Sequence, residues 1–226
     1  MKPGIIAGVA FTFALAVSAP AGAAEMQSKM PASPAAVSGY ITAITVWSQG
    51  VHGLQAQEVA ALIGVNQGAG TALEYANRHD AKAGQAWVTP WATARRAELA
   101  NLRQSAAALQ TDPPAPPPGV NDPTIPAVVA SLRDGALKSR QMAVTTADLG
   151  EEMLGLIERT AAGDADAPNT LVVRRLDVNQ VLLRGEISTT ELALAALGED
   201  HPEKDVGKAT IADDLALIAL LDYQKA

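Results

Sequence analysis

The chain has 226 residues and a formal net charge of −7; 48% of its residues are hydrophobic, but only 4% are aromatic. An acidic chain repels the phosphates of nucleic acids and of anionic membranes, so neither is expected as a partner. The absence of cysteine excludes disulfide scaffolds, thiol catalysis, thiolate zinc sites and c-type haem attachment. Ala and Leu dominate over β-branched and aromatic residues, which favours helices over sheets.

The first 24 residues have the organisation of a secretory signal peptide. Lys2 supplies the positive start, residues 5–17 are apolar, and Pro20 precedes the small residues 21–24, which fit a cleavage site. The apolar run is shorter than the ~20 residues that a transmembrane helix needs. We therefore expect cleavage, export to the periplasm or the medium, and no transmembrane anchor in the mature chain.

After a disordered leader (25–33), residues 34–111 are expected to form an N-terminal helical unit. A helix start is predicted where a capping residue is followed directly by Pro, as at Ser33-Pro34 and Thr89-Pro90. A start is also predicted where an acidic residue lies three positions after the capping residue, as at Thr71…Glu74. Gly84 is a predicted stop. Apolar residues step by three and four along one helix face at Tyr40, Ile44, Trp47, Val51 and Leu54. The glycines of the same stretch (Gly39, Gly50 and Gly53) predict close packing or a kink.

Residues 112–123 differ from the rest of the chain in their proline content. Between Asp112 and Gly119 lie five prolines and one alanine, and Pro123 follows. Such a run favours polyproline II and excludes helix and sheet. It is interpreted as a linker between two helical units or as a loop across one bundle. The charge also changes here: residues 25–111 carry five acidic and six basic side chains, whereas residues 112–226 carry nineteen acidic and ten basic ones.

Residues 124–226 are expected to form an acidic C-terminal helical unit. Starts are predicted at Asp122-Pro123, Asn169, Ser188…Glu191 and Thr210…Asp213, and stops at Gly163 and Gly198. The stretch 171–173 is interpreted as helical, with a short strand as the alternative. The last helix is apolar on most sides, which predicts burial at the centre. Together these signals predict an all-α bundle of about six or seven helices. The alternative arrangement is two helical halves joined by the Pro-rich stretch.

Known catalytic and phosphate-binding motifs are absent from the sequence: it contains neither the serine nucleophile elbow nor a zinc-binding HExxH or a Gly-rich phosphate loop. Trp87 and Trp91 are four residues apart and are candidates for a ligand groove. The alternative is that they pack around a helix start at Thr89-Pro90 as a hydrophobic staple. No cofactor is expected.

The stretch 185–192 resembles the second half of an EF-hand calcium loop, with Gly185 at loop position six and Glu191 at position twelve. The resemblance fails in the first half, where the ligand positions are Gln180, Leu182 and Arg184. Asp177 and Asn179 look like the missing start but lie three residues too early. The alternative is a capping box, Ser188…Glu191, that opens a new helix after Gly185. A metal site at Glu191, Asp177 and Asn179 is thus the less favoured interpretation.

These observations predict an exported envelope protein that acts by binding, as an accessory or interaction protein. Its expected partner is an envelope protein or a small apolar ligand. The alternative is a periplasmic, hydrolase-like enzyme whose carboxylates converge only in the fold.

Overall fold

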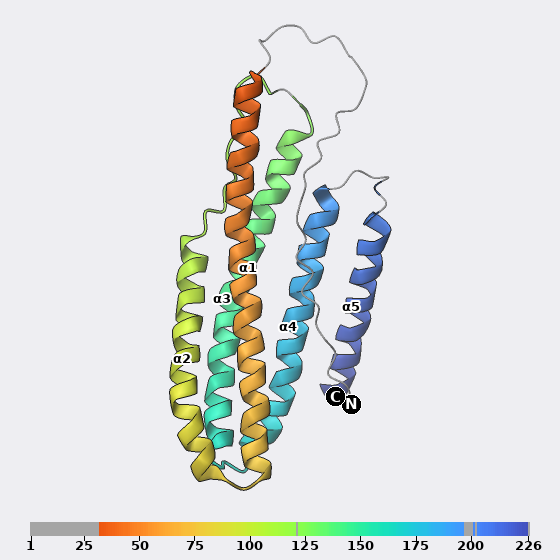
Figure 1. Cartoon of the computed structure of the whole chain (residues 1–226). Helices are drawn as coiled ribbons and strands as arrows, with labels where there is room; N and C mark the ends of the chain where they lie inside the picture. The colour runs from red at the N-terminus through yellow and green to blue at the C-terminus, as the bar shows by residue number, and fades with distance from the viewer. Residues whose placement is uncertain (1–31, 121, 197–200, 202, 226) are drawn as a thin grey trace. The chain divides into compact units, whose positions relative to one another are not determined.

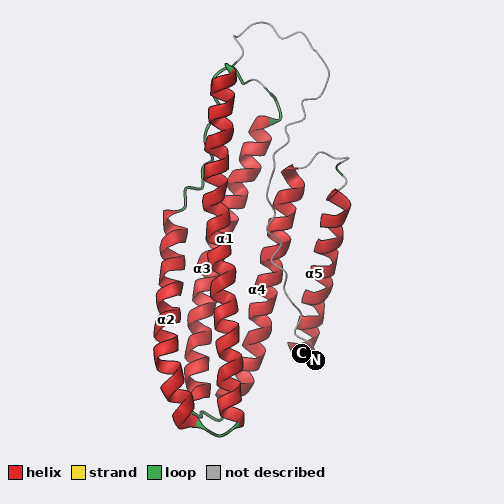
Figure 2. Cartoon of the chain, in the orientation of Figure 1, coloured by secondary structure: helices red, strands yellow, loops and turns green. Residues whose placement is uncertain are grey.

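The computed structural model describes residues 32–120, 122–196, 201 and 203–225. These residues form five α-helices, and none of them lies in a strand (Figures 1 and 2). The helices are α1 (Pro34–Asn77), α2 (Ala81–Ala108), α3 (Ile125–Ala161), α4 (Ala167–Ala196) and α5 (Glu203–Lys225). The all-α prediction is confirmed, with five helices in the described part of the chain instead of six or seven. The predicted signal peptide, most of the predicted leader and Gly198 lie outside the described residues.

The count was too high because several predicted helix starts lie inside helices. Thr71 is within α1, Pro90 within α2, Ser188 within α4 and Thr210 within α5. The hydroxyls of Thr71, Thr89 and Thr210 are satisfied without ending the helix, because each donates a hydrogen bond to the carbonyl four residues earlier. Pro90 does cost a backbone hydrogen bond, but buried Val88 and Ala92 on either side of it hold α2 in place.

The signals predicted at Ser33 and Gly163 are confirmed, because both residues lie at the end of a helix. The Ser33 hydroxyl accepts a hydrogen bond from the Ala36 amide at 3.2 Å and begins α1. Gly163 has φ +87°, a left-handed conformation that suits glycine, and directly follows α3 and its C-cap residue Ala162. Gly84 and Gly185, in contrast, lie inside helices and end nothing. The break between α1 and α2 comes instead at Asp80, whose carboxylate accepts from the Ala83 amide at 3.1 Å.

The core lies where α3 packs against α1, α2 and α4, and α1 packs in addition against α2 and α4. Many of its fully buried residues are alanines, which let the helix backbones approach one another closely. Its larger buried side chains come from all four helices: Leu62, Val65, Leu99, Leu102, Met153, Leu154, Ile157, Leu171 and Val178. The helical interpretation of 171–173 is confirmed, because these residues lie in α4.

The prediction of a buried last helix is wrong. In the described part of the chain, α5 packs against α4 alone, beside which it lies in Figure 1. Its buried residues are Asp214 and Ile218, whereas Leu215, Leu217 and Leu220 are about half exposed. An edge helix buries one face only, so apolar residues around its whole circumference do not place it at the centre. None of the five helices is long and apolar enough to span a membrane.

Candidate functional site

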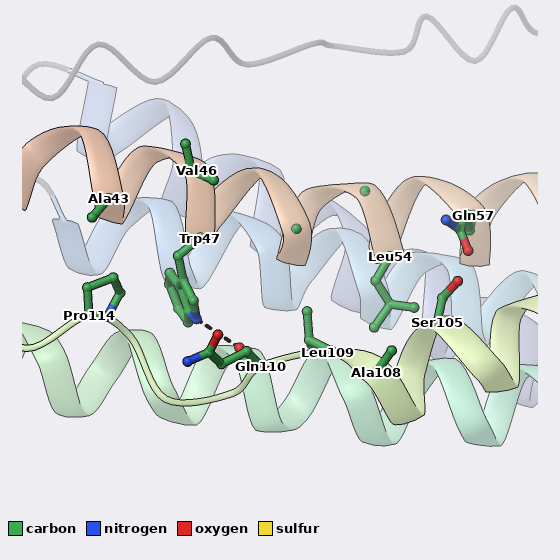
Figure 3. Close-up of a pocket in the computed structure, with 12 residues that line it drawn as sticks. Ala43, Val46, Trp47, Leu54, Gln57, Ser105, Ala108, Leu109, Gln110 and Pro114 are labelled. Atoms are coloured by element: carbon green, nitrogen blue, oxygen red, sulfur yellow. Dashed lines mark hydrogen bonds between the residues drawn. The ribbon is translucent and has the colours of Figure 1, made fainter.

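The candidate site is a groove between α1 and the C-terminal end of α2. α1 has 44 residues and α2 has 28, so the Pro-rich segment 109–120 takes over beside α1 where α2 ends (Figure 1). This segment has neither helix nor strand, as its prolines predict. The groove has a volume of about 810 Å³ and is lined by Ala43, Val46, Trp47, Gly50, Gly53, Leu54, Gln57, Ser105, Ala108, Leu109, Gln110 and Pro114 (Figure 3).

Trp47 belongs to one wall of this groove and is hydrogen-bonded to the opposite wall. Its indole N–H donates a hydrogen bond of 2.8 Å to the backbone carbonyl of Gln110, the second residue after α2 (Figure 3). Pro114 follows on the same strip of chain and faces the stretch of α1 near Ala43. The bond therefore attaches the beginning of the Pro-rich segment to α1 and keeps the two sides of the groove in register.

Two glycines of α1 leave this groove open. A Cβ atom on Gly53 would meet no heavy atom within 4 Å, and one on Gly50 would meet only Cδ1 of Leu109, at 4.0 Å. The expectation of close packing is therefore wrong at Gly53, and also at Gly39, where the space around a Cβ is equally empty. Glycine along one face of a helix signals either close approach of a neighbour or free space, and the sequence does not distinguish the two.

The described residues that line the groove are all uncharged. They combine aliphatic side chains and the Trp47 ring with two amides and one hydroxyl, those of Gln57, Gln110 and Ser105. A volume of this size and a mostly apolar wall with few polar groups are typical of sites for small organic ligands. The lining that the structure describes provides contact area and hydrogen bonds, and none of its side chains is a carboxylate or an imidazole that could act in acid–base chemistry.

Trp87 and Trp91 lie on α2, and the groove is formed by other residues. Their rings stack with centroids 5.2 Å apart, and Tyr75 of α1 continues the row at 5.7 Å from Trp87. Both tryptophans are half-buried against the core. The staple interpretation is wrong in its geometry, because Pro90 lies inside α2 and no helix begins between the two rings.

The structure does not bring Asp177, Asn179 and Glu191 together. All three lie on α4, where fourteen residues separate Asp177 from Glu191, or ~21 Å along a helix. Neither an EF-hand loop nor a capping box forms at Gly185, because α4 continues through it. Within the described residues, no group of three or more histidine and carboxylate side chains could hold a metal ion.

Asp177 and Asn179 instead join α4 to its neighbours. The Asp177 carboxylate binds Lys225 of α5 at 2.5 Å and Arg174 at 2.8 Å. Burial acts to raise the pKa of Asp177, but the hydrogen bonds from Lys225 and Arg174 outweigh it and lower that pKa. The Asn179 amide oxygen accepts from Asn66 of α1 at 3.4 Å, and Glu191 is exposed.

Two buried carboxyl groups lie outside the groove. The Glu58 carboxylate on α1 accepts a hydrogen bond of 2.8 Å from the Thr146 hydroxyl on α3, and burial raises the pKa of Glu58. Asp214 on α5 is buried, and its Oδ2 atom has no hydrogen-bond partner within the described chain. The pKa of Asp214 is raised by burial and, to a smaller extent, by the charge of Asp213. The pKa of Glu186 on α4 is raised by burial and by the charge of Asp214.

Comparison of the chain with protein-family models, with curated proteins and with solved structures finds no match.

Proposed function

We propose that this is an exported envelope protein that acts by binding, and that the groove beside Trp47 holds a small apolar ligand. The observation that carries the proposal is the groove itself, which is open, ligand-sized, uncharged and formed where α1 extends past α2. The first 24 residues support export by their signal-peptide pattern. The lack of an acid–base group in the groove lining favours binding over the hydrolase alternative.

The site is tested with N-phenylnaphthylamine, an uncharged apolar dye whose fluorescence rises in apolar surroundings. The mature protein is expected to bind it saturably. Gly53→Leu should remove this binding, because the new side chain extends into space that is empty in the structure. The matched control is Gly70→Leu, also on α1 and also with an empty surrounding, but outside the groove lining.

Both substitutions replace a helix-interior glycine, so both should raise intrinsic helix stability by a similar amount, ~1 kcal/mol. Loss of dye binding in Gly53→Leu with retention in Gly70→Leu supports the groove as the site. Equal binding by wild type and Gly53→Leu, or no binding by wild type, would contradict it.

Export is tested separately. The mature chain should begin between Ala21 and Met26, because the small residues that fit the cleavage site follow Pro20. N-terminal sequencing of protein recovered from the periplasm or medium measures this directly. A full-length chain retained in the cytoplasm would contradict the proposed location.

A further inference from the structure

The groove beside Trp47 continues into a second hollow along the same two helices. This hollow has a volume of about 340 Å³ and is lined by Gln57, Ala60, Ala61, Glu98, Asn101 and Ser105. Gln57 and Ser105 line both spaces, so the two are continuous at these residues. On α1 the combined lining runs from Ala43 to Ala61, a span of nineteen residues and ~27 Å of helix. That length suits an extended chain better than a compact molecule.

The lining changes in character along this length. The end beside Trp47 is formed mainly by Ala43, Val46 and Pro114, with the Gln110 amide as a polar group. The other end presents the amides of Gln57 and Asn101 and the Ser105 hydroxyl. Within the described chain, the side chains of Gln57, Asn101 and Ser105 make no hydrogen bond to protein, and all three are at least partly exposed. These three groups are therefore available to a ligand as both donors and acceptors.

Among the described residues, the polar end offers no unpaired charge. The one ionised side chain in this part of the lining, Glu98, forms an ion pair of 2.5 Å with Arg95, one turn earlier on α2. A ligand with a charged head would have to compete with this pair or leave its own charge without a partner, and both lower affinity. An uncharged head with hydroxyl groups can use the amides and the Ser105 hydroxyl directly.

We infer that the occupant is a single-chain amphiphile with an uncharged, hydroxyl-bearing head. Its hydrocarbon chain lies against Trp47, Val46 and Leu109, and its head lies at Gln57, Asn101 and Ser105. This inference rests on the proposed function, because it assigns a ligand class to the same groove. It adds a direction to the site and a rule of selectivity that an apolar groove alone lacks.

The test is displacement of N-phenylnaphthylamine from the mature protein by amphiphiles that share a decyl chain and differ in the head. Decyl glucoside should displace the dye at a concentration about ten times lower than decanoate or decyltrimethylammonium, each used below its micelle concentration. Two or more additional hydrogen bonds account for a factor of this size.

Asn101 lines the second hollow and is absent from the lining of the groove beside Trp47, so Asn101→Leu changes the polar end alone. It should weaken decyl glucoside about fivefold, the effect of one lost hydrogen bond, and leave dye binding at the apolar end unchanged. The matched control is Gln104→Leu, which replaces an exposed amide of α2 outside both linings. This control should behave as wild type.

The outcomes separate the two proposals. Dye binding that Gly53→Leu removes, without preference among the three heads, overturns the amphiphile and leaves the proposed function in place. Equal loss of decyl glucoside affinity in Asn101→Leu and Gln104→Leu also overturns it, since the Asn101 amide would then act only through the general polarity of the surface. Absence of dye binding in wild type overturns both.

Discussion

The Trp91 ring occupies the place that a side chain on Gly68 would need. A Cβ atom on Gly68 would lie 2.1 Å from two ring atoms of Trp91, so α1 and α2 fit together here only because residue 68 has no side chain. Gly68→Ala is expected to lower the free energy of unfolding by about 1–3 kcal/mol through overpacking. Chemical denaturation monitored by circular dichroism measures the change.

Gly70→Ala is the matched control for this prediction. It lies two residues further along α1, where an added Cβ meets nothing within 4 Å. The exchange should stabilise the protein by about 0.5–1 kcal/mol, because alanine is the better helix former. Equal effects of the two substitutions would mean that the Trp91 ring does not restrict residue 68.

The buried Glu58 should make stability depend on pH. Its folded pKa is raised above the ordinary 4.5, so its ionised form carries a burial cost in the native state at neutral pH. This cost disappears as the pH falls through the raised pKa and is absent below 4.5. Glu58→Gln can still accept the Thr146 hydrogen bond without a charge, so it should raise the melting temperature at pH 7 and have little effect at pH 4. Glu191→Gln, at an exposed position, serves as the control. An equal change in melting temperature in Glu58→Gln at pH 4 and at pH 7 would contradict the prediction.

The contact between Arg96 of α2 and Glu158 of α3 is bidentate, with hydrogen bonds of 2.9 and 2.6 Å. Both side chains are partly exposed, so a double-mutant cycle with alanine should give a coupling energy of about 0.2–1 kcal/mol that decreases in high salt. The comparison cycle is Arg78 with Glu74, where the side chains are 70% and 68% exposed. That pair should show almost no coupling, and a larger value than for Arg96–Glu158 would contradict the role assigned to geometry.

Trp47→Phe should loosen the beginning of the Pro-rich segment. The substitution keeps an aromatic ring in the groove but removes the hydrogen bond to the Gln110 carbonyl. Proteases cleave poorly beside prolines, so wild type should be cut at the edges of the segment, near Gln110 and Val120. In Trp47→Phe the cut near Gln110 should become faster by several-fold, since the bond is worth about 0.5–1.5 kcal/mol. Limited proteolysis followed by mass spectrometry measures the rate of this cut, with Tyr40→Phe as control. If the wild type were cleaved first within 128–160, the prediction would be contradicted.

The sequence predicted those features that depend on local chemistry. The Ser33 cap, the end of α3 at Gly163 and the irregular Pro-rich segment each follow from what a few neighbouring residues can and cannot do. Predicted starts at Pro90 and Ser188 failed because a capping pattern is only a local preference. Packing on both sides of such a pattern carries the helix through it.

The site was less predictable, because it depends on where two helices end relative to each other. Trp47 stood in the apolar seam of its helix, and nothing nearby in sequence indicates that its indole reaches a carbonyl 63 residues away. Trp87 and Trp91 were the more conspicuous pair, yet they stack within the packing of α1 against α2. The empty space at Gly53 likewise depends on where the neighbouring elements lie, since none of them brings a heavy atom within 4 Å of a Cβ on this residue.

Because α1 is longer than α2, the shape of the groove can change during evolution while the packing of the bundle stays the same. The core is built from residues of the helices themselves, whereas one wall of the groove is chain that follows the end of α2. Insertions, deletions or altered proline spacing in that wall would reshape the cavity while the buried residues stay as they are. The proposed ligand selectivity could therefore change through a stretch of backbone whose prolines lie outside the buried core.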